Sequence, residues 1–116
     1  MSKIHRIKSI IYDKRGMVLS IGENFYQRSH PHQARHAEKV GESYKIFLHS
    51  EIHAITRLPY LAKAHRILIT RYDAKGDPAL AAPCKICRSA ISETPIKVIQ
   101  YTTADGIYEE NITEWS

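Results

Sequence analysis

The sequence predicts an α/β fold built on one mixed five-stranded sheet whose last two strands are antiparallel. Five short stretches rich in β-branched and aromatic residues alternate with stretches that have helical apolar spacing. Residues 102–106 are too few for the crossover that parallel neighbours need, so the last two strands should run antiparallel. The length of 116 residues suits one unit, and we expect residues 1–116 to form a single domain.

The five strands are each marked by runs of Ile, Val, Tyr or Thr. They are expected at residues 4–12, 17–21, 66–72, 96–101 and 107–113. The turn DKRG joins the first two strands in a hairpin, with Gly16 at a position where a positive φ is common.

Three helices are expected, at residues 33–41, 50–64 and 83–93. Gly41 suits the C-cap of the first helix, and Pro83 suits the first turn of the third. The second helix has one apolar stripe at helical spacing, which runs from Ile52 to Leu61. Pro59 interrupts this stripe, so we expect the helix to kink or restart there.

The composition favours a cytoplasmic protein and is compatible with an anionic ligand. No apolar run approaches the ~18 residues of a membrane span, and residues 1–13 lack the apolar region of a signal peptide. The net charge of +5 is compatible with a nucleotide or nucleic acid, although many basic proteins bind neither. The basic segment Arg28–His36 is a candidate for phosphate contact, with a solvated loop and helix start as the alternative.

Two sequence patterns indicate a metal site. His-x-Glu occurs twice, at residues 36–38 and 49–51, and Pro-Cys-x-x-Cys follows at residues 83–87. In this order the patterns are typical of zinc deaminases. A CxxC pair can also be a redox motif, but such a pair usually follows an early strand, and this one lies late in the chain. A disulfide is disfavoured in a reducing cytoplasm.

The second His-x-Glu copy is the one that chain geometry brings to the cysteines. A helix over residues 50–64 would extend about 22 Å, and a strand over residues 65–72 would return about 26 Å. His49 therefore becomes a neighbour of Cys84 and Cys87, close to helix N-termini that favour thiolates.

The first copy fits this geometry less well. Its helix ends at Gly41, and nothing in the spacing returns His36 to the cysteines. We interpret His36 and Glu38 as an exposed helix turn, with a substrate-contacting loop as the alternative. A purely structural zinc site would need a fourth ligand, which could come from another histidine: His5, His30, His32, His53 or His65.

The segments HSEIHAI and PCKICRSAI resemble the motifs of the cytidine deaminase-like superfamily. A finer resemblance, around HPHQARHAEK and KIFLHSEIHA, is to small deaminase-like proteins of bacteriophages. The resemblance implies a three-layer-type sandwich in which His49, Cys84 and Cys87 hold Zn²⁺. It implies that Glu51 shuttles protons beside the metal and that Arg88 offsets the charge of the thiolates.

The same resemblance implies a substrate pocket. Asn24 would contact a sugar, and Phe25 or Tyr26 would pack on a base. Ser50 and Pro83 would line the base pocket through their backbone.

The chain also departs from the family pattern. Ser50 stands where the family commonly has Ala, and the interval between His49 and the cysteines is somewhat long. The helix that usually precedes the first hairpin is absent, which leaves one sheet face thinly covered. We infer that a second copy covers this face, so a homo-oligomer is expected.

The expected activity is zinc-dependent hydrolytic deamination of a cytosine-type base, as nucleoside or nucleotide, with release of ammonia. Zinc would activate the attacking water. Antiparallel last strands resemble the nucleoside-cytidine and bacterial-toxin branch of the superfamily. Two alternatives stay open: a deaminase of single-stranded nucleic acid that uses residues 28–36 with Phe25, Tyr26 and Tyr44, and a non-catalytic zinc-binding module.

Overall fold

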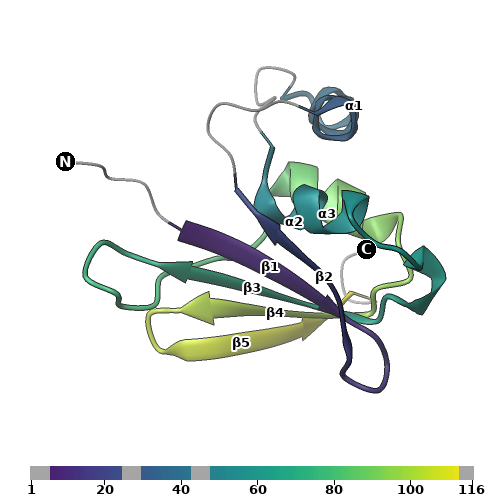
Figure 1. Ribbon diagram of the computed structural model, residues 1–116. Coiled ribbons are helices and arrows are strands. Elements are labelled where there is room, and N and C mark those ends of the chain that lie inside the picture. The colour runs from purple at the N-terminus through teal and green to yellow at the C-terminus, as the bar shows by residue number, and fades with distance from the viewer. Residues whose placement is uncertain (1–5, 25–29, 43–47, 113–116) are drawn as a thin grey trace.

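A computed structural model describes residues 6–24, 30–42 and 48–112 of the chain. Five strands form one sheet in the order β2-β1-β3-β4-β5 (Figure 1). The strands are β1 (Arg6–Tyr12), β2 (Val18–Glu23), β3 (Arg66–Tyr72), β4 (Val98–Thr103) and β5 (Gly106–Asn111). The helices are α1 (Pro31–Lys39), α2 (Ser50–Thr56) and α3 (Lys85–Ser92), with a short 3₁₀ turn η1 (Leu61–Lys63).

The sheet is mixed, as the sequence predicts. β3 and β4 are parallel, and the other three neighbouring pairs are antiparallel, including β4 with β5. The crossover between the parallel strands contains α3, which is the usual form of such a connection. β2 extends beyond the predicted residues to Glu23, because Gly22 and Glu23 still pair with β1.

The three helices lie on one face of the sheet, so the described chain has two layers (Figure 1). The expected three-layer sandwich is therefore wrong. Ile11, Ile67 and Ile69 are fully buried under the helices, whereas Ile10 and Leu68 on the opposite face remain partly exposed. Tight turns join β1 to β2 and β4 to β5, so within the described residues these connections place no helix on the second face. Cover by a second copy stays a prediction.

Two helices, α2 and α3, are shorter than the sequence suggests, whereas α1 has the predicted length of nine residues but begins two residues earlier, at Pro31. α2 ends at Thr56 rather than at residue 64, because Leu58 precedes Pro59 and that position disfavours helical backbone. The chain restarts as η1 beyond Pro59. α3 begins at Lys85, with Cys84 rather than Pro83 at its N-terminal boundary. No helix in the described ranges is long and apolar enough to cross a membrane.

The core has two parts. The first lies between the sheet and α2 and α3, and it contains mainly buried isoleucines, among them Ile11, Ile67, Ile69, Ile91 and Ile99. The second joins the three helices to one another, and its buried members are Ala37, Leu48, Ile52, Ile86, Cys87 and Ala90. Cys87 therefore belongs both to the CxxC motif and to the interhelical core.

Helix α2 lies directly on the backbone of β2. A Cβ atom at Gly22 would overlap the backbone nitrogen of Ala54 and the carbonyl oxygen of Ser50. The neighbouring inward positions carry small hydroxyl residues that bond to the helix. Ser20 Oγ donates to the Ala54 carbonyl oxygen at 2.8 Å, and the hydroxyls of Ser9 and Ser50 are 2.7 Å apart. These contacts fix the position of the α2 N-terminus above the sheet.

We expect the substitution Gly22→Ala to lower the free energy of unfolding by about 1–3 kcal/mol or more, because the added methyl group forces α2 away from the strand. Urea titration of both proteins measures the change. Ile21→Val is the matched control, since it alters one methyl group on the opposite, exposed side of the same strand. Its expected effect is about 0.5 kcal/mol or less. Equal losses in both variants would contradict the close approach.

Candidate metal centre

The N-terminal ends of α2 and α3 bring together His49, Cys84 and Cys87. His49 Nδ1 lies 3.3 Å from Cys87 Sγ and 3.5 Å from Cys84 Sγ. All three possible ligand atoms lie within 4.8 Å of one another. A tetrahedral zinc ion, with bonds of about 2.0–2.1 Å to nitrogen and about 2.3 Å to sulfur, would hold these atoms about 3.6 Å apart. The side chains are thus positioned to hold a metal of this kind.

The two thiols have opposite electrostatic environments. The Cys87 thiol, with further help from His49, lowers the pKa of Cys84 to about 3. Burial and the adjacent Cys84 raise the pKa of Cys87 well above its ordinary value. The pair thus favours one thiolate and one thiol, and full ionisation of both requires a nearby cation. Two sulfur donors and one imidazole are the donor set that zinc prefers.

Glu51 is a buried carboxyl group beside this cluster. Burial raises its pKa, although a hydrogen bond from Ser50 opposes the shift. Ser50 Oγ donates to Glu51 Oε1 at 2.9 Å, so the Ser9 hydroxyl must donate to Ser50. Two buried hydroxyl groups therefore form a short chain that ends at the carboxylate. Ser9 was not predicted, although a polar residue at an inward position of an Ile-rich strand could have indicated it.

Helix α1 contacts the metal-centre segment through Gln33. This side chain is fully buried, and its Oε1 accepts a hydrogen bond from the backbone N–H of His49 at 3.2 Å. His49 sits at the N-terminal boundary of α2. Gln33 thus fixes the backbone of one cluster residue from a separate helix. The sequence indicates it only weakly, as a polar residue three positions from His36 on the same helix.

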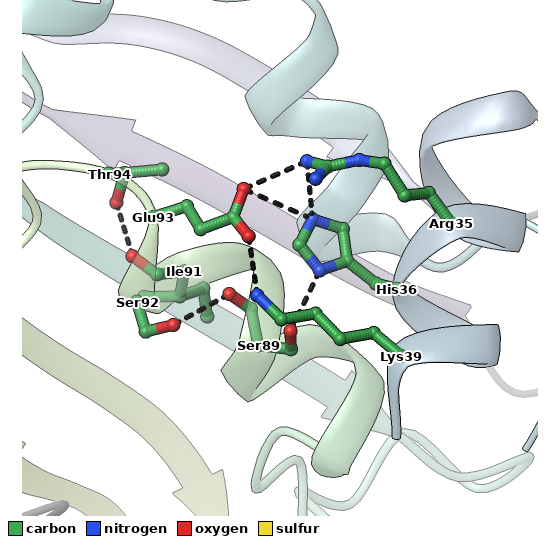
Figure 2. Close-up of polar contacts among 8 residues, drawn as sticks. All are labelled: Arg35, His36, Lys39, Ser89, Ile91, Ser92, Glu93 and Thr94. Atoms are coloured by element: carbon green, nitrogen blue, oxygen red, sulfur yellow. Dashed lines mark hydrogen bonds and ion pairs between the residues drawn. The ribbon is translucent and has the colours of Figure 1, made fainter. Parts of the chain in front are cut away.

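His36 of the first His-x-Glu copy lies in the joint between α1 and α3 (Figure 2), whereas Glu38 is exposed. The prediction of an exposed turn is wrong for His36, whose side chain is fully buried. Its Nδ1 donates to Ser89 Oγ at 2.8 Å, since its Nε2 accepts from Arg35 at 3.1 Å. Around it, Glu93 pairs with Arg35 and Lys39 at 2.8 Å each. His36 lies outside the metal-binding group.

The remaining histidines with described side-chain bonds have other partners. His53 Nδ1 accepts the backbone N–H of Glu23, and His30 Nδ1 accepts that of His32. Within the described ranges the group close enough to share a metal consists of His49, Cys84 and Cys87. The described residues therefore offer three protein donors for a shared metal ion and no fourth.

The residues expected to contact substrate are placed as follows. Asn24 follows β2 directly, and its Oδ1 accepts the backbone N–H of Ile7 at 3.1 Å. Pro83 is buried, and its carbonyl oxygen accepts from Arg88 Nε at 3.2 Å. Arg88 also pairs with Glu110 at 3.4 Å. Phe25, Tyr26 and Tyr44 lie outside the described residues. The substrate contacts of Asn24, Phe25, Ser50 and Pro83 stay predictions.

Comparison with known proteins gives a match in structure and none in sequence. No protein-family model and no curated protein matches the chain. The structure is similar to the crystal structure of a cytidine deaminase from Burkholderia pseudomallei, with a TM-score of 0.62 and 14% identity. The match covers 95% of this chain and 77% of that one. The predicted resemblance to the cytidine deaminase-like fold is confirmed.

We expect the substitution Gln33→Met to weaken zinc binding by about tenfold or more, because it keeps the side-chain volume but leaves the buried N–H of His49 without its acceptor. Competition with a chromogenic chelator measures the zinc affinity. Glu38→Met on the exposed side of α1 is the control and should leave the affinity unchanged. Unaltered affinity in Gln33→Met would show that α1 does not support the cluster.

Hydrogen bonds from Lys39 and Arg35 lower the pKa of Glu93 from 4.5 to about 2. Because the folded-state pKa lies below the ordinary value, these bonds stabilise the fold above about pH 4.5, and the contribution is lost as the pH falls toward 2. The Tm difference between the native protein and Glu93→Gln should thus be largest near pH 7 and should shrink below pH 4.5. Thermal unfolding between pH 7 and pH 3 tests this, and a pH-independent difference would contradict it.

Proposed function

We propose that the protein is a zinc-dependent hydrolytic deaminase of a cytosine-type base, carried by a nucleoside or nucleotide. The observation that carries the proposal is the buried carboxyl group of Glu51 beside a histidine and two cysteines. The cytidine deaminase-like fold supports the same reaction class. A structural zinc site usually has four protein ligands, whereas three donors leave a position open for chemistry.

Each residue has a definite part in the proposed reaction. His49, Cys84 and Cys87 would hold zinc, which when bound lowers the pKa of a water molecule and so supplies the nucleophile. Glu51 carries two protons in turn: it takes one from the attacking water and gives it to the ring nitrogen, then takes the second from the newly added hydroxyl group and gives it to the departing amine. The carbon–nitrogen bond to the exocyclic amine breaks, a carbonyl group remains, and ammonia leaves.

The surroundings of Glu51 suit this proton transfer. Burial raises the pKa of this carboxyl group toward neutral pH, and a group with such a pKa can both accept and donate a proton. Ser50 donates to Oε1, which keeps one carboxylate oxygen fixed and leaves the other for the exchanged proton. Ser9 supports Ser50 from the sheet, so the carboxylate is oriented by two elements.

The preference for cytosine rests on the antiparallel pairing of the last two strands. Antiparallel β4 and β5 resemble the nucleoside-cytidine and bacterial-toxin branch of the superfamily. Asn24 lies just after β2, where the resemblance implies a contact to the sugar. We therefore propose a nucleoside or nucleotide as substrate, and single-stranded nucleic acid is the competing substrate class that the assay must include.

We expect the substitution Glu51→Gln to reduce deamination by about 10²–10⁴-fold while zinc stays bound, because only the proton carrier is removed. Cytidine, deoxycytidine, their monophosphates and a cytosine-containing oligonucleotide are incubated with each protein, and ammonia and product are measured. Glu38→Gln in the other His-x-Glu copy is the matched control and should retain activity. Conversion that persists in Glu51→Gln refutes the proposed role.

Metal content separates loss of chemistry from loss of zinc. Elemental analysis should give equal zinc in the native protein, Glu51→Gln and Glu38→Gln. Cys84→Ala should lower the zinc content and the activity together. Undiminished zinc in Cys84→Ala would remove this residue from the ligand set.

A further inference from the structure

A cavity opens at the end of the sheet where β1 turns into β2. Its volume is about 570 Å³, within the range of small-ligand sites. Three chain segments line it: the β1–β2 turn, the segment from η1 to the start of β3, and the residues before β4. Its polar side chains are Asp13, Lys14, Arg15, Lys63, His65 and Lys97. Four permanently positive groups therefore face a single carboxylate.

The walls of this cavity are held to one another by backbone hydrogen bonds. The N–H of His65 donates to the carbonyl oxygen of Tyr12 at 2.9 Å, and the N–H of Lys97 donates to that of His65 at 2.9 Å. Within the turn, Asp13 Oδ1 accepts the backbone N–H groups of Arg15 and Met17. One oxygen of the carboxylate thus serves the turn, and the frame that carries the cations is preformed.

The positive side chains around the cavity lack carboxylate partners. Among the described residues, Lys14, Arg15 and Lys97 take part in no ion pair, in contrast to Arg35 and Lys39, which are both bound to Glu93. All three are exposed and free to turn toward a ligand. Like charges gathered around one concave surface create a positive potential that attracts anions.

The cavity is remote from the metal centre. It borders the first residues of β3, whereas the chain reaches α3 and the cysteines only after leaving the far end of that strand. Figure 1 shows the β1–β2 turn and the β4–β5 turn at opposite ends of the sheet. The α2 N-terminus lies over the middle of the sheet, since Ser50 contacts Ser9, which pairs with Ile69. Four residues of strand, about 13 Å at about 3.3 Å per residue, separate Ile69 from His65 at the cavity.

We propose that this cavity is a second binding site, which binds phosphate groups. These phosphates do not belong to the nucleotide whose base occupies the metal centre. The ligand chemistry is a run of adjacent phosphates, as in a free polyphosphate or the backbone of a single strand. Lys14 and Lys97, from opposite walls, contact the phosphates directly. Tyr60, exposed and with Lys63 above its ring at 5.3 Å, offers an aromatic surface beside the site.

The test uses zinc-loaded protein and inorganic pyrophosphate as the probe. Calorimetry should show saturable binding of about one pyrophosphate per chain, and amide signals of Lys14, Lys63 and Lys97 should shift in NMR spectra. The double substitution Lys14→Glu with Lys97→Glu should weaken binding by about tenfold or more. Zinc content is measured before and after titration, so that removal of the metal is not mistaken for binding.

A matched double variant separates a site from general charge. Lys8→Glu with Lys75→Glu alters two exposed lysines outside the cavity and changes the net charge equally, from +5 to +1, since each substitution removes two units. Its affinity for pyrophosphate should stay within about twofold of the native value. Equal weakening in both double variants overturns the proposal, as does the absence of saturable binding. Unfolding curves confirm that both variants fold.

An oligonucleotide distinguishes the source of the phosphates. If a single strand is the ligand, an oligothymidylate binds and pyrophosphate competes with it. The logarithm of the association constant for the oligonucleotide falls with the logarithm of the salt concentration. In the cavity variant this slope should then be less steep, by about 0.7 for each phosphate that the variant no longer neutralises. If a free polyphosphate is the ligand, the cavity variant binds pyrophosphate less tightly than the native protein. Any binding of the oligonucleotide is then equal in the two proteins. Oligonucleotide binding that requires the cavity lysines, without any binding of pyrophosphate, would refute a site for adjacent phosphates.

Discussion

The contact of α2 with the bare backbone of β2 at Gly22 is the constraint on which the rest of the structure depends. Without a side chain at that position, the helix descends until Ser20 and Ser9 bond to it directly. This fixes the height and direction of the α2 N-terminus, which carries both His49 and Glu51. The other partners of the centre are then arranged around a fixed point, with α3 supplying two thiols and α1 closing over both helices.

Charge within the centre is balanced by neighbouring groups rather than by solvent. The buried carboxyl group of Glu51 and the buried thiol of Cys87 lie beside the half-buried Cys84, and burial together with the neighbouring acidic groups raises the cost of ionising Glu51 and Cys87. A bound divalent cation would reverse this relation by stabilising both thiolates. The joint between α1 and α3 differs from the metal centre in where its charges lie. His36 is buried there, while the charges of Arg35, Lys39 and Glu93 remain at the surface.

Much of this arrangement could be predicted from local patterns. The mixed sheet, its antiparallel end and the proximity of His49 to the cysteines follow from spacing that the chain itself fixes. The shorter α2 did not alter that proximity, because the residues after Thr56 still lead to the start of β3. The roles of Ser9, Gly22 and Gln33 could not be predicted, because each depends on which element packs against it. The prediction of three layers was wrong for the same reason, because the number of layers is set by packing and not by the periodicity of the sequence.

The sheet topology also sets the order in which the chain can assemble. The hairpins β1–β2 and β4–β5 pair residues that are close in sequence, and such units form within microseconds. The pairing of β1 with β3, which joins Tyr12 to Arg66 and Arg6 to Tyr72, must close a long loop and is slower. His49 and Cys84, 35 positions apart, meet only after β3 has docked and the chain has returned. The donor set is therefore incomplete in a chain whose β3 has not yet paired with β1, so we expect metal capture to follow this pairing.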